Sequence, residues 1–127
     1  MQRTTYLSRR PTSISHALVR ESKILAITQA VAYFFGMPTE ELHQNNTKRA
    51  VTVPRQIAMY LIKQMTDASL PEIGRQFGGK HHSTVMHAIA RIEERRHIDV
   101  GLDFTISELI HNIRGQMKGP KVSCKMS

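Results

Sequence analysis

The stretch that most constrains the fold of this chain is SLPEIGRQFGGKHHSTVMH, residues 69–87. It opens on Ser69 and Glu72, which have the spacing of a capping box. In that motif the serine hydroxyl accepts from the glutamate amide, and the carboxylate reaches back to the serine amide. Pro71 falls in the opening turn, where a missing N–H is tolerated. A helix is therefore expected over residues 69–77. Its buried stripe at helical spacing consists of Leu70, Ile73 and Phe77.

Two consecutive glycines, Gly78 and Gly79, follow that helix. Glycine adopts the positive φ of a helix C-cap and lets the next helix cross the first sharply. A second helix is expected over residues 82–97, with an apolar face made by Val85, Ala88, Ile89 and Ile92. Groups that can reach base edges and phosphates stand at its start and on its other face: His81, His82, Ser83, Thr84, His87 and Arg91. The stretch thus predicts a helix-turn-helix.

A longer segment, VPRQIAMYLIKQMTDASLPEIGRQFGGKHHSTVMHAIARIEE, resembles the DNA-binding C-terminal domain of the bacterial chromosomal replication initiator DnaA family. That family couples a PRQIAMYL-type helix to SLPEIG, then FGG with a basic residue, then an acidic residue, His, two hydroxyls and Val. The upstream segment ITQAVAYFFGMPTEELHQNNTKRAV is similar to the first helix and basic loop of the same domain. The resemblance covers residues 24–114 and implies binding of duplex DNA at initiator-type boxes. A chain of 127 residues has no room for the family's ATPase module, so neither catalysis nor a cofactor is expected.

The resemblance also implies roles for individual residues. Base reading in the major groove is expected from His81, His82, Ser83 and Thr84. Contacts with the DNA backbone or the adjoining minor groove are expected from Lys48, Arg49, Arg55, Gln56, Lys63, Leu70, Pro71, Lys80 and Arg91. The residues themselves, without the resemblance, favour the DNA-backbone contacts of the loop, because a basic loop that leads into a helix N-terminus attracts phosphate. An ordinary solvated turn is the alternative for that loop. The family often has further arginines where Asn46 and Thr47 stand, so a weaker minor-groove contact is expected.

His81 departs most from the family pattern, since an acidic residue is usual there. An acidic side chain can both cap the recognition helix and accept a hydrogen bond from a cytosine amino group. Neutral histidine does either only partly, and it is the poorer cap. We therefore expect general DNA affinity to survive while the preferred sequence changes. Ser83, where the family has threonine, lacks a methyl that could pack on thymine.

Composition agrees with one DNA-binding domain. The chain has 127 residues, 40% of them hydrophobic, no tryptophan and a formal net charge of +8, which favours an all-α domain with a basic surface. Residues 43–96 hold nine Lys or Arg against four Asp or Glu. A simple solvated basic face is the alternative interpretation. The single cysteine, Cys124, allows no intramolecular disulfide, and no export signal or membrane span is apparent. A cytoplasmic, nucleoid-associated monomer is the default expectation.

We expect a small helical bundle of about six helices, over residues 14–36, 39–44, 53–66, 69–77, 82–97 and 103–115. An irregular start, to about residue 13, belongs to a basic arm over residues 1–20. The DNA-binding domain is expected over residues 21–115, followed by a disordered basic tail over 116–127. Arg55 and Lys63 are expected to stay outside the core. The expected core of the first, third and last helices comprises Ile24, Leu25, Ile27, Val31, Ala32, Phe34, Phe35, Ile57, Ala58, Leu61, Ile62, Met65, Ile106, Leu109, Ile110 and Ile113.

The sequence leaves three alternatives to DNA binding. Residues 74–80 have the GxxxxGK spacing of a phosphate loop, but His81 replaces the usual Ser or Thr and the segment follows a helix, not a strand. His81, His82 and His87 suggest a metal site, but their offsets do not align on one helical face and no carboxylate or thiolate accompanies them. The third alternative is an adaptor that uses the initiator fold to contact replication proteins, with its acidic flanks meeting a partner.

Overall fold

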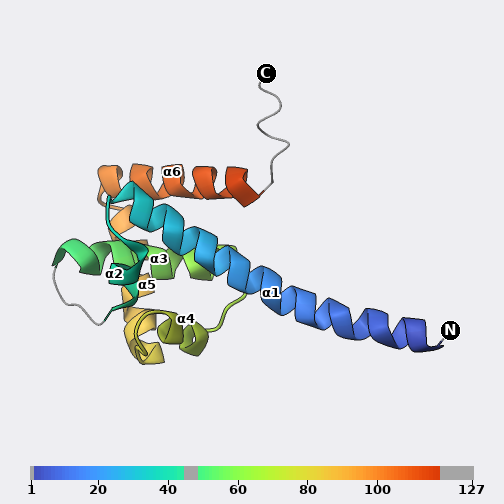
Figure 1. Cartoon of the computed structure of the whole chain (residues 1–127). Coiled ribbons are helices and arrows are strands. Elements are labelled where there is room, and N and C mark those ends of the chain that lie inside the picture. Colours follow the sequence, from blue (N-terminus) through green and yellow to red (C-terminus); the bar gives the residue numbers. More distant parts are fainter. Residues whose placement is uncertain (1, 45–48, 118–127) are drawn as a thin grey trace, which may run out of the picture.

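The computed structural model describes the backbone of residues 2–44 and 49–117, and the side chains of residues 18–44 and 50–116. Over these residues the chain is entirely helical, without a strand, which confirms the predicted all-α class (Figure 1). The six helices are α1 (Gln2–Phe34), α2 (Thr39–His43), α3 (Arg49–Met65), α4 (Leu70–Gln76), α5 (His82–Arg96) and α6 (Val100–Met117). No helix in the described ranges is both long enough and apolar enough to cross a membrane.

Three helices begin earlier than the sequence pattern predicted. α1 begins at Gln2, so the expectation of an irregular start to about residue 13 was wrong. That segment contains no glycine, and extending an existing helix is cheaper than starting one. α3 begins at Arg49, because its first turn buries Val51, and Pro54 consequently lies inside the helix. α6 begins at Val100, where Asp99 Oδ1 accepts from the Leu102 amide at 3.1 Å and caps the helix.

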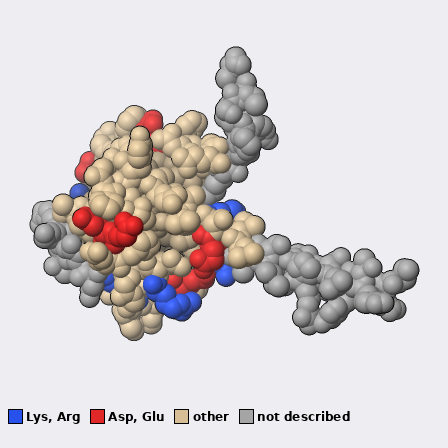
Figure 2. All heavy atoms as spheres, viewed as in Figure 1, with Lys and Arg blue, Asp and Glu red and all other residues tan. Residues whose placement is uncertain are grey.

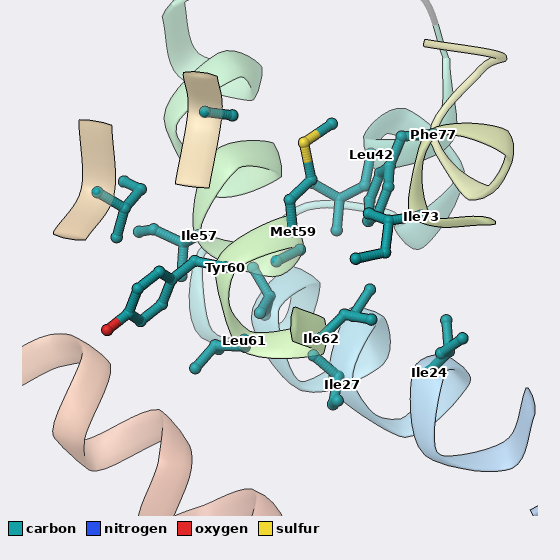
Figure 3. Packing of buried hydrophobic residues seen from close by; sticks show 14 of the residues in the cluster. Ile24, Ile27, Leu42, Ile57, Met59, Tyr60, Leu61, Ile62, Ile73 and Phe77 are labelled. Carbon is teal, nitrogen blue, oxygen red and sulfur yellow. The ribbon is translucent and has the colours of Figure 1, made fainter. Parts of the chain in front are cut away.

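The core is organised around α3, which contacts α1, α2, α4 and α5. Six consecutive residues of α3, numbers 57–62, are buried, so the middle of this helix is enclosed on all sides, whereas Lys63 and Gln64 beyond it are exposed (Figure 3). Met59 and Tyr60 were therefore missed as core residues. Met65, which was expected to be buried, is only partly so. α3 thus forms the support against which the helix-turn-helix packs.

α1 packs against α3, and α6 packs against α1 and α5, in each case along a stripe of apolar residues. The predicted stripe is confirmed for Ile24, Ile27, Val31 and Ala32 of α1 and for Ile106, Leu109 and Ile113 of α6. The predicted burial of Leu25, Phe34 and Phe35 is wrong, since all three are exposed. The helix ends at Phe34, and Gly36 turns the chain with a φ of 65°. The two phenylalanines lie edge to face at the end of α1, with ring centroids 5.2 Å apart.

A polar network links the central helix to α5 and α6. The Tyr60 hydroxyl donates to Glu93 Oε1 at 2.8 Å and accepts from an Arg96 Nη at 2.9 Å. Arg96 Nε also donates to Asp103 Oδ1 at 2.7 Å. Burial raises the pKa of the Tyr60 phenol, and its bond to Glu93 adds to the shift. These bonds fix the C-terminal half of α5 relative to α3, and so fix the direction in which its N-terminal half points.

Candidate nucleic-acid interface

The turn between α4 and α5 has the double-glycine geometry that the sequence predicted. Gly78 and Gly79 have φ values of 81° and 72°, in the left-handed region that side chains disfavour. The α4 segment also depends on Gly74, which is buried. The Lys80 amide donates to the Gly74 carbonyl at 2.9 Å, and a Cβ at position 74 would lie only 2.1 Å from the Lys80 carbonyl oxygen. Only glycine fits there without a shift of the turn.

The sequence pattern assigned Gly74 only to a phosphate loop, and sequence reasoning missed its structural role. The signal was a glycine in the middle of a short predicted helix, where close approach of another backbone is a common reason for it. In the structure, Gly74–Gln76 is helical, and the Phe77 and Lys80 amides both donate to the Gly74 carbonyl. These two amides are therefore used in hydrogen bonds within the turn, whereas the amides of a phosphate-binding nest point outward to the ligand.

Half of the predicted capping box is present at the start of α4. Ser69 Oγ accepts from the Glu72 amide at 3.3 Å. The Glu72 carboxylate, expected on the Ser69 amide, instead accepts from Arg20 Nε at 3.1 Å. Arg20 also reaches Asp67 Oδ1 at 3.4 Å, and its hydrogen bond to Glu72 raises the pKa of the guanidinium. α1 thereby anchors the first helix of the helix-turn-helix, a tertiary contact that local spacing could not predict.

α5 divides into a buried face and an exposed face. Val85, Ala88 and Ile92 are buried, and Ile89 is partly so, as the pattern predicted. On the other face, the predicted base-reading residues His82 and Thr84 are exposed, together with His87 and the predicted backbone contact Arg91. The start of α5 therefore presents short hydrogen-bonding side chains to solvent, and a cation, Arg91, lies farther along the same helix. This is the geometry in which a second helix of a helix-turn-helix enters a groove.

His81 is the N-cap of α5. Its Nδ1 accepts from the Ser83 amide at 3.1 Å and lies 2.8 Å from Ser83 Oγ. The His81 and His82 rings lie against one another, with centroids 4.3 Å apart. Histidine therefore supplies the capping bond that an acidic residue would make. Ser83, predicted as a base-reading residue, is half-buried and has its hydroxyl beside the His81 ring.

Arg55 corrects the sequence analysis most clearly. We expected its side chain outside the core, but it is only 4% exposed. Arg55 Nε donates to the Leu42 carbonyl at 3.1 Å, and one Nη donates to the Gln44 carbonyl at 2.8 Å. Burial lowers the pKa of the guanidinium. Arg55 is drawn inward because carbonyls at the end of α2 need donors, and it therefore holds the residues that lead into the 45–48 segment.

The remaining predicted backbone contacts fall into two groups. Lys48 lies outside the described residues, and so does the side chain of Arg49. Lys63 is exposed, with its Nζ 3.5 Å from the Ala68 carbonyl, and Pro71 is exposed at the start of α4. The half-buried members of the set are Gln56, Leu70 and Lys80. Burial lowers the pKa of Lys80, and the charge of Arg55 lowers it further.

Figure 2 looks onto α1 and α4 and shows acidic and basic side chains mixed on that face, so no single sign dominates it. Among the described residues, His, Cys, Asp and Glu side chains do not gather in threes that could hold a metal ion.

A further histidine, His43, hydrogen-bonds through Nδ1 to the Gln76 carbonyl and stacks on Phe77, which joins α2 to the end of α4. Sequence reasoning missed this contact, because it joins residues far apart in the chain.

Comparison with known proteins agrees with this geometry. The family model described as "Bacterial dnaA protein helix-turn-helix" matches residues 24–92. Proteins named chromosomal replication initiator protein DnaA are similar: that of Symbiobacterium thermophilum is 41% identical over 97 residues, and that of Caulobacter vibrioides 46% over 89. These alignments cover 76% and 70% of this chain but only 21% and 18% of the relatives.

A solved structure described as a DNA replication initiation factor is also similar, with a TM-score of 0.67 and 28% identity. The alignment covers 84% of this chain and 31% of that one. The chain thus spans about a fifth of the length of the relatives named above. The family match includes the capped α4, the double-glycine turn and α5 as far as Ile92. On these grounds, the chain belongs to the bacterial DnaA helix-turn-helix family.

Proposed function

We propose that this chain binds duplex DNA with a preference for particular sequences and acts in the control of replication initiation or of transcription. The exposed face of α5 carries the proposal. His82, Thr84 and His87 stand on it, while the opposite face is held against the domain. Side chains of this length and chemistry reach base edges when a recognition helix lies in the major groove. Such a chain works at the nucleoid.

Phosphate contacts are proposed from the cations around this helix. Lys63 and Arg91 are exposed, and Lys80 is half-buried in the turn. Lys48 and Arg49 remain proposed contacts for the minor groove and adjoining backbone, with Gln56, Leu70 and Pro71 nearby in the sequence. We assign Arg55 a positioning role, because its guanidinium is buried against backbone carbonyls.

The first test is the salt dependence of binding. Each neutralised phosphate contributes about 0.9 to the slope of log affinity against log salt concentration. With Arg55 removed from the set, the five cations named above predict a slope of roughly −4.5. Fluorescence anisotropy of one labelled duplex at several salt concentrations measures it. A slope shallower than about −2 would contradict this docking arrangement.

The second test separates base reading from phosphate binding. Thr84→Ala or His82→Ala should reduce discrimination between a preferred and a scrambled duplex, by about 1–3 kcal/mol for each lost base contact. Arg91→Ala should weaken binding to both duplexes about equally. Arg114→Ala is the matched control, since Arg114 is an exposed arginine on α6, at the end of the domain opposite α4 (Figure 1). If the alanine variants at 82 and 84 lose affinity equally on both duplexes, these residues do not read bases.

The adaptor alternative predicts a different result in the same assay. An adaptor of the replication machinery should bind a box-containing duplex and a scrambled duplex with nearly equal affinity. DNA binding in the proposed mode should instead let the chain occupy initiator boxes in competition with other box-binding proteins. Selection of bound sequences from a random duplex pool identifies the preferred site without prior assumption. An unenriched pool would favour the adaptor.

A further inference from the structure

We propose that His81 presents a hydrogen-bond donor to the major groove, and therefore selects against cytosine and in favour of guanine at the base that it faces. The inference rests on the proposed function and names the sequence class of its DNA target. It begins from the cap of α5, where a ring nitrogen of His81 accepts from a backbone amide. The identity of that nitrogen determines what the rest of the ring can offer.

The capping bond assigns the tautomer of His81. A backbone N–H can only donate, so the nitrogen opposite it must carry a lone pair. That nitrogen is Nδ1, which lies 3.1 Å from the Ser83 amide nitrogen. A neutral imidazole has one hydrogen, which must then be on Nε2. Ser83 Oγ lies 2.8 Å from the same Nδ1, and in this tautomer the hydroxyl and the Ser83 amide both donate to the one lone pair of Nδ1.

The contacts of the ring also direct its donor. Nδ1 is turned toward the first turn of α5, so the ring edge that carries Nε2 faces away from the cap. The ring is further held by His82, whose ring is inclined by 33° to it. His81 is exposed, and within the described part of the chain Nε2 has no protein partner. The N–H of Nε2 is therefore available to a base beside the start of the recognition helix.

The bases differ in how they meet such a donor. In the major groove cytosine presents only its amino donor, whereas guanine presents two acceptors, N7 and O6. Adenine offers N7 and thymine offers O4. A donor on His81 is thus matched by guanine, tolerated by adenine and thymine, and opposed by cytosine. The acidic residue that is usual in the family is an acceptor only, so its preference has the opposite sign.

The decisive experiment uses two variants of equal size, His81→Asn and His81→Asp. Both side chains have an oxygen that can accept the Ser83 amide and cap α5. The second terminal group is then an NH₂ donor in His81→Asn and an acceptor oxygen in His81→Asp. Preferred sequences are first selected from a random duplex pool for the wild type and both variants. At each position where wild type and His81→Asp select different bases, four duplexes are made that carry each of the four bases there. The affinity of each protein for these four duplexes is then measured at pH 8.

We expect one position at which wild type and His81→Asn bind guanine more tightly than cytosine, by about fivefold or more, since one base contact is worth about 5- to 150-fold. At the same position His81→Asp should prefer cytosine. His111→Asp, which places a carboxylate on α6, is the control for added negative charge and should leave the ranking unchanged. Thermal unfolding of each variant checks that it is folded.

Three results would overturn the inference. One is a wild type that prefers cytosine at the position where it differs from His81→Asp, and another is the absence of any position where they differ. The third is independent of DNA: ¹⁵N shifts of the His81 ring that place the hydrogen on Nδ1. If the wild type selects no sequence at all while its Nε2 carries the hydrogen, the proposed function fails, and the base preference fails with it. The tautomer assignment would then still stand, so the two failures are distinguishable.

Discussion

Replacing Gly74 with alanine tests the close packing of the helix-turn-helix directly. A Cβ at this position would lie 2.1 Å from the Lys80 carbonyl oxygen, so the backbone has to move by about 1 Å before the contact becomes tolerable. Overpacking of this kind costs about 1–3 kcal/mol. Weakening the Lys80 amide bond to the Gly74 carbonyl costs about 1 kcal/mol more. The better helix propensity of alanine returns about 1 kcal/mol.

The net expectation for Gly74→Ala is a loss of about 2 kcal/mol in the free energy of unfolding, or roughly 10 °C in Tm. Urea and thermal unfolding measure it. Gly115→Ala is the matched control, because Gly115 is also in a helix but has open space where its Cβ would point. It should gain about 0.5–1 kcal/mol. The reasoning is refuted if Gly74→Ala is as stable as the wild type while Gly115→Ala shows its gain.

Three further outcomes follow from the same contacts. Arg55→Lys keeps the charge but replaces the donors on two separate nitrogens, Nε and Nη, by a single ammonium group, so it should lose about 1–3 kcal/mol in urea unfolding. Arg75→Lys, on the exposed side of α4, is the control and should change stability by less than about 0.5 kcal/mol. Tyr60→Phe should lose about 1 kcal/mol near neutral pH, since its hydroxyl bonds Glu93 and Arg96; an unchanged midpoint of unfolding would contradict this. Burial raises the pKa of Tyr60 in the folded protein above the value of about 10 that it has in the unfolded chain. The neutral phenol therefore stabilises the fold below about pH 10, and this contribution is lost as the pH rises through the pKa of the folded state. Tyr60→Phe should accordingly lose less stability than the wild type between about pH 9 and 11.

The sequence by itself determined the elements whose bonds join residues a few positions apart. Ser69 could be identified as the cap of α4 because its partner amide is three residues on. Gly78 and Gly79 could be identified as the turn because their backbone conformation excludes most other residues. The apolar face of α5 followed from its 3–4 spacing. The same spacing also determined the exposed face of α5, which carries most of the predicted base-reading residues.

Tertiary structure decided everything that depends on a neighbour far along the chain. Arg55 reads as a surface cation, yet it is buried because the carbonyls of Leu42 and Gln44 lie where it can donate to them. Glu72 has the spacing of a capping box, but Arg20, 52 residues away, takes its carboxylate. Periodicity in α3 marked one face as buried, whereas the packing of neighbouring helices encloses its middle, residues 57–62, on all sides. Local spacing specifies which bonds a segment can make, and only the assembled fold decides which partner is present to make them.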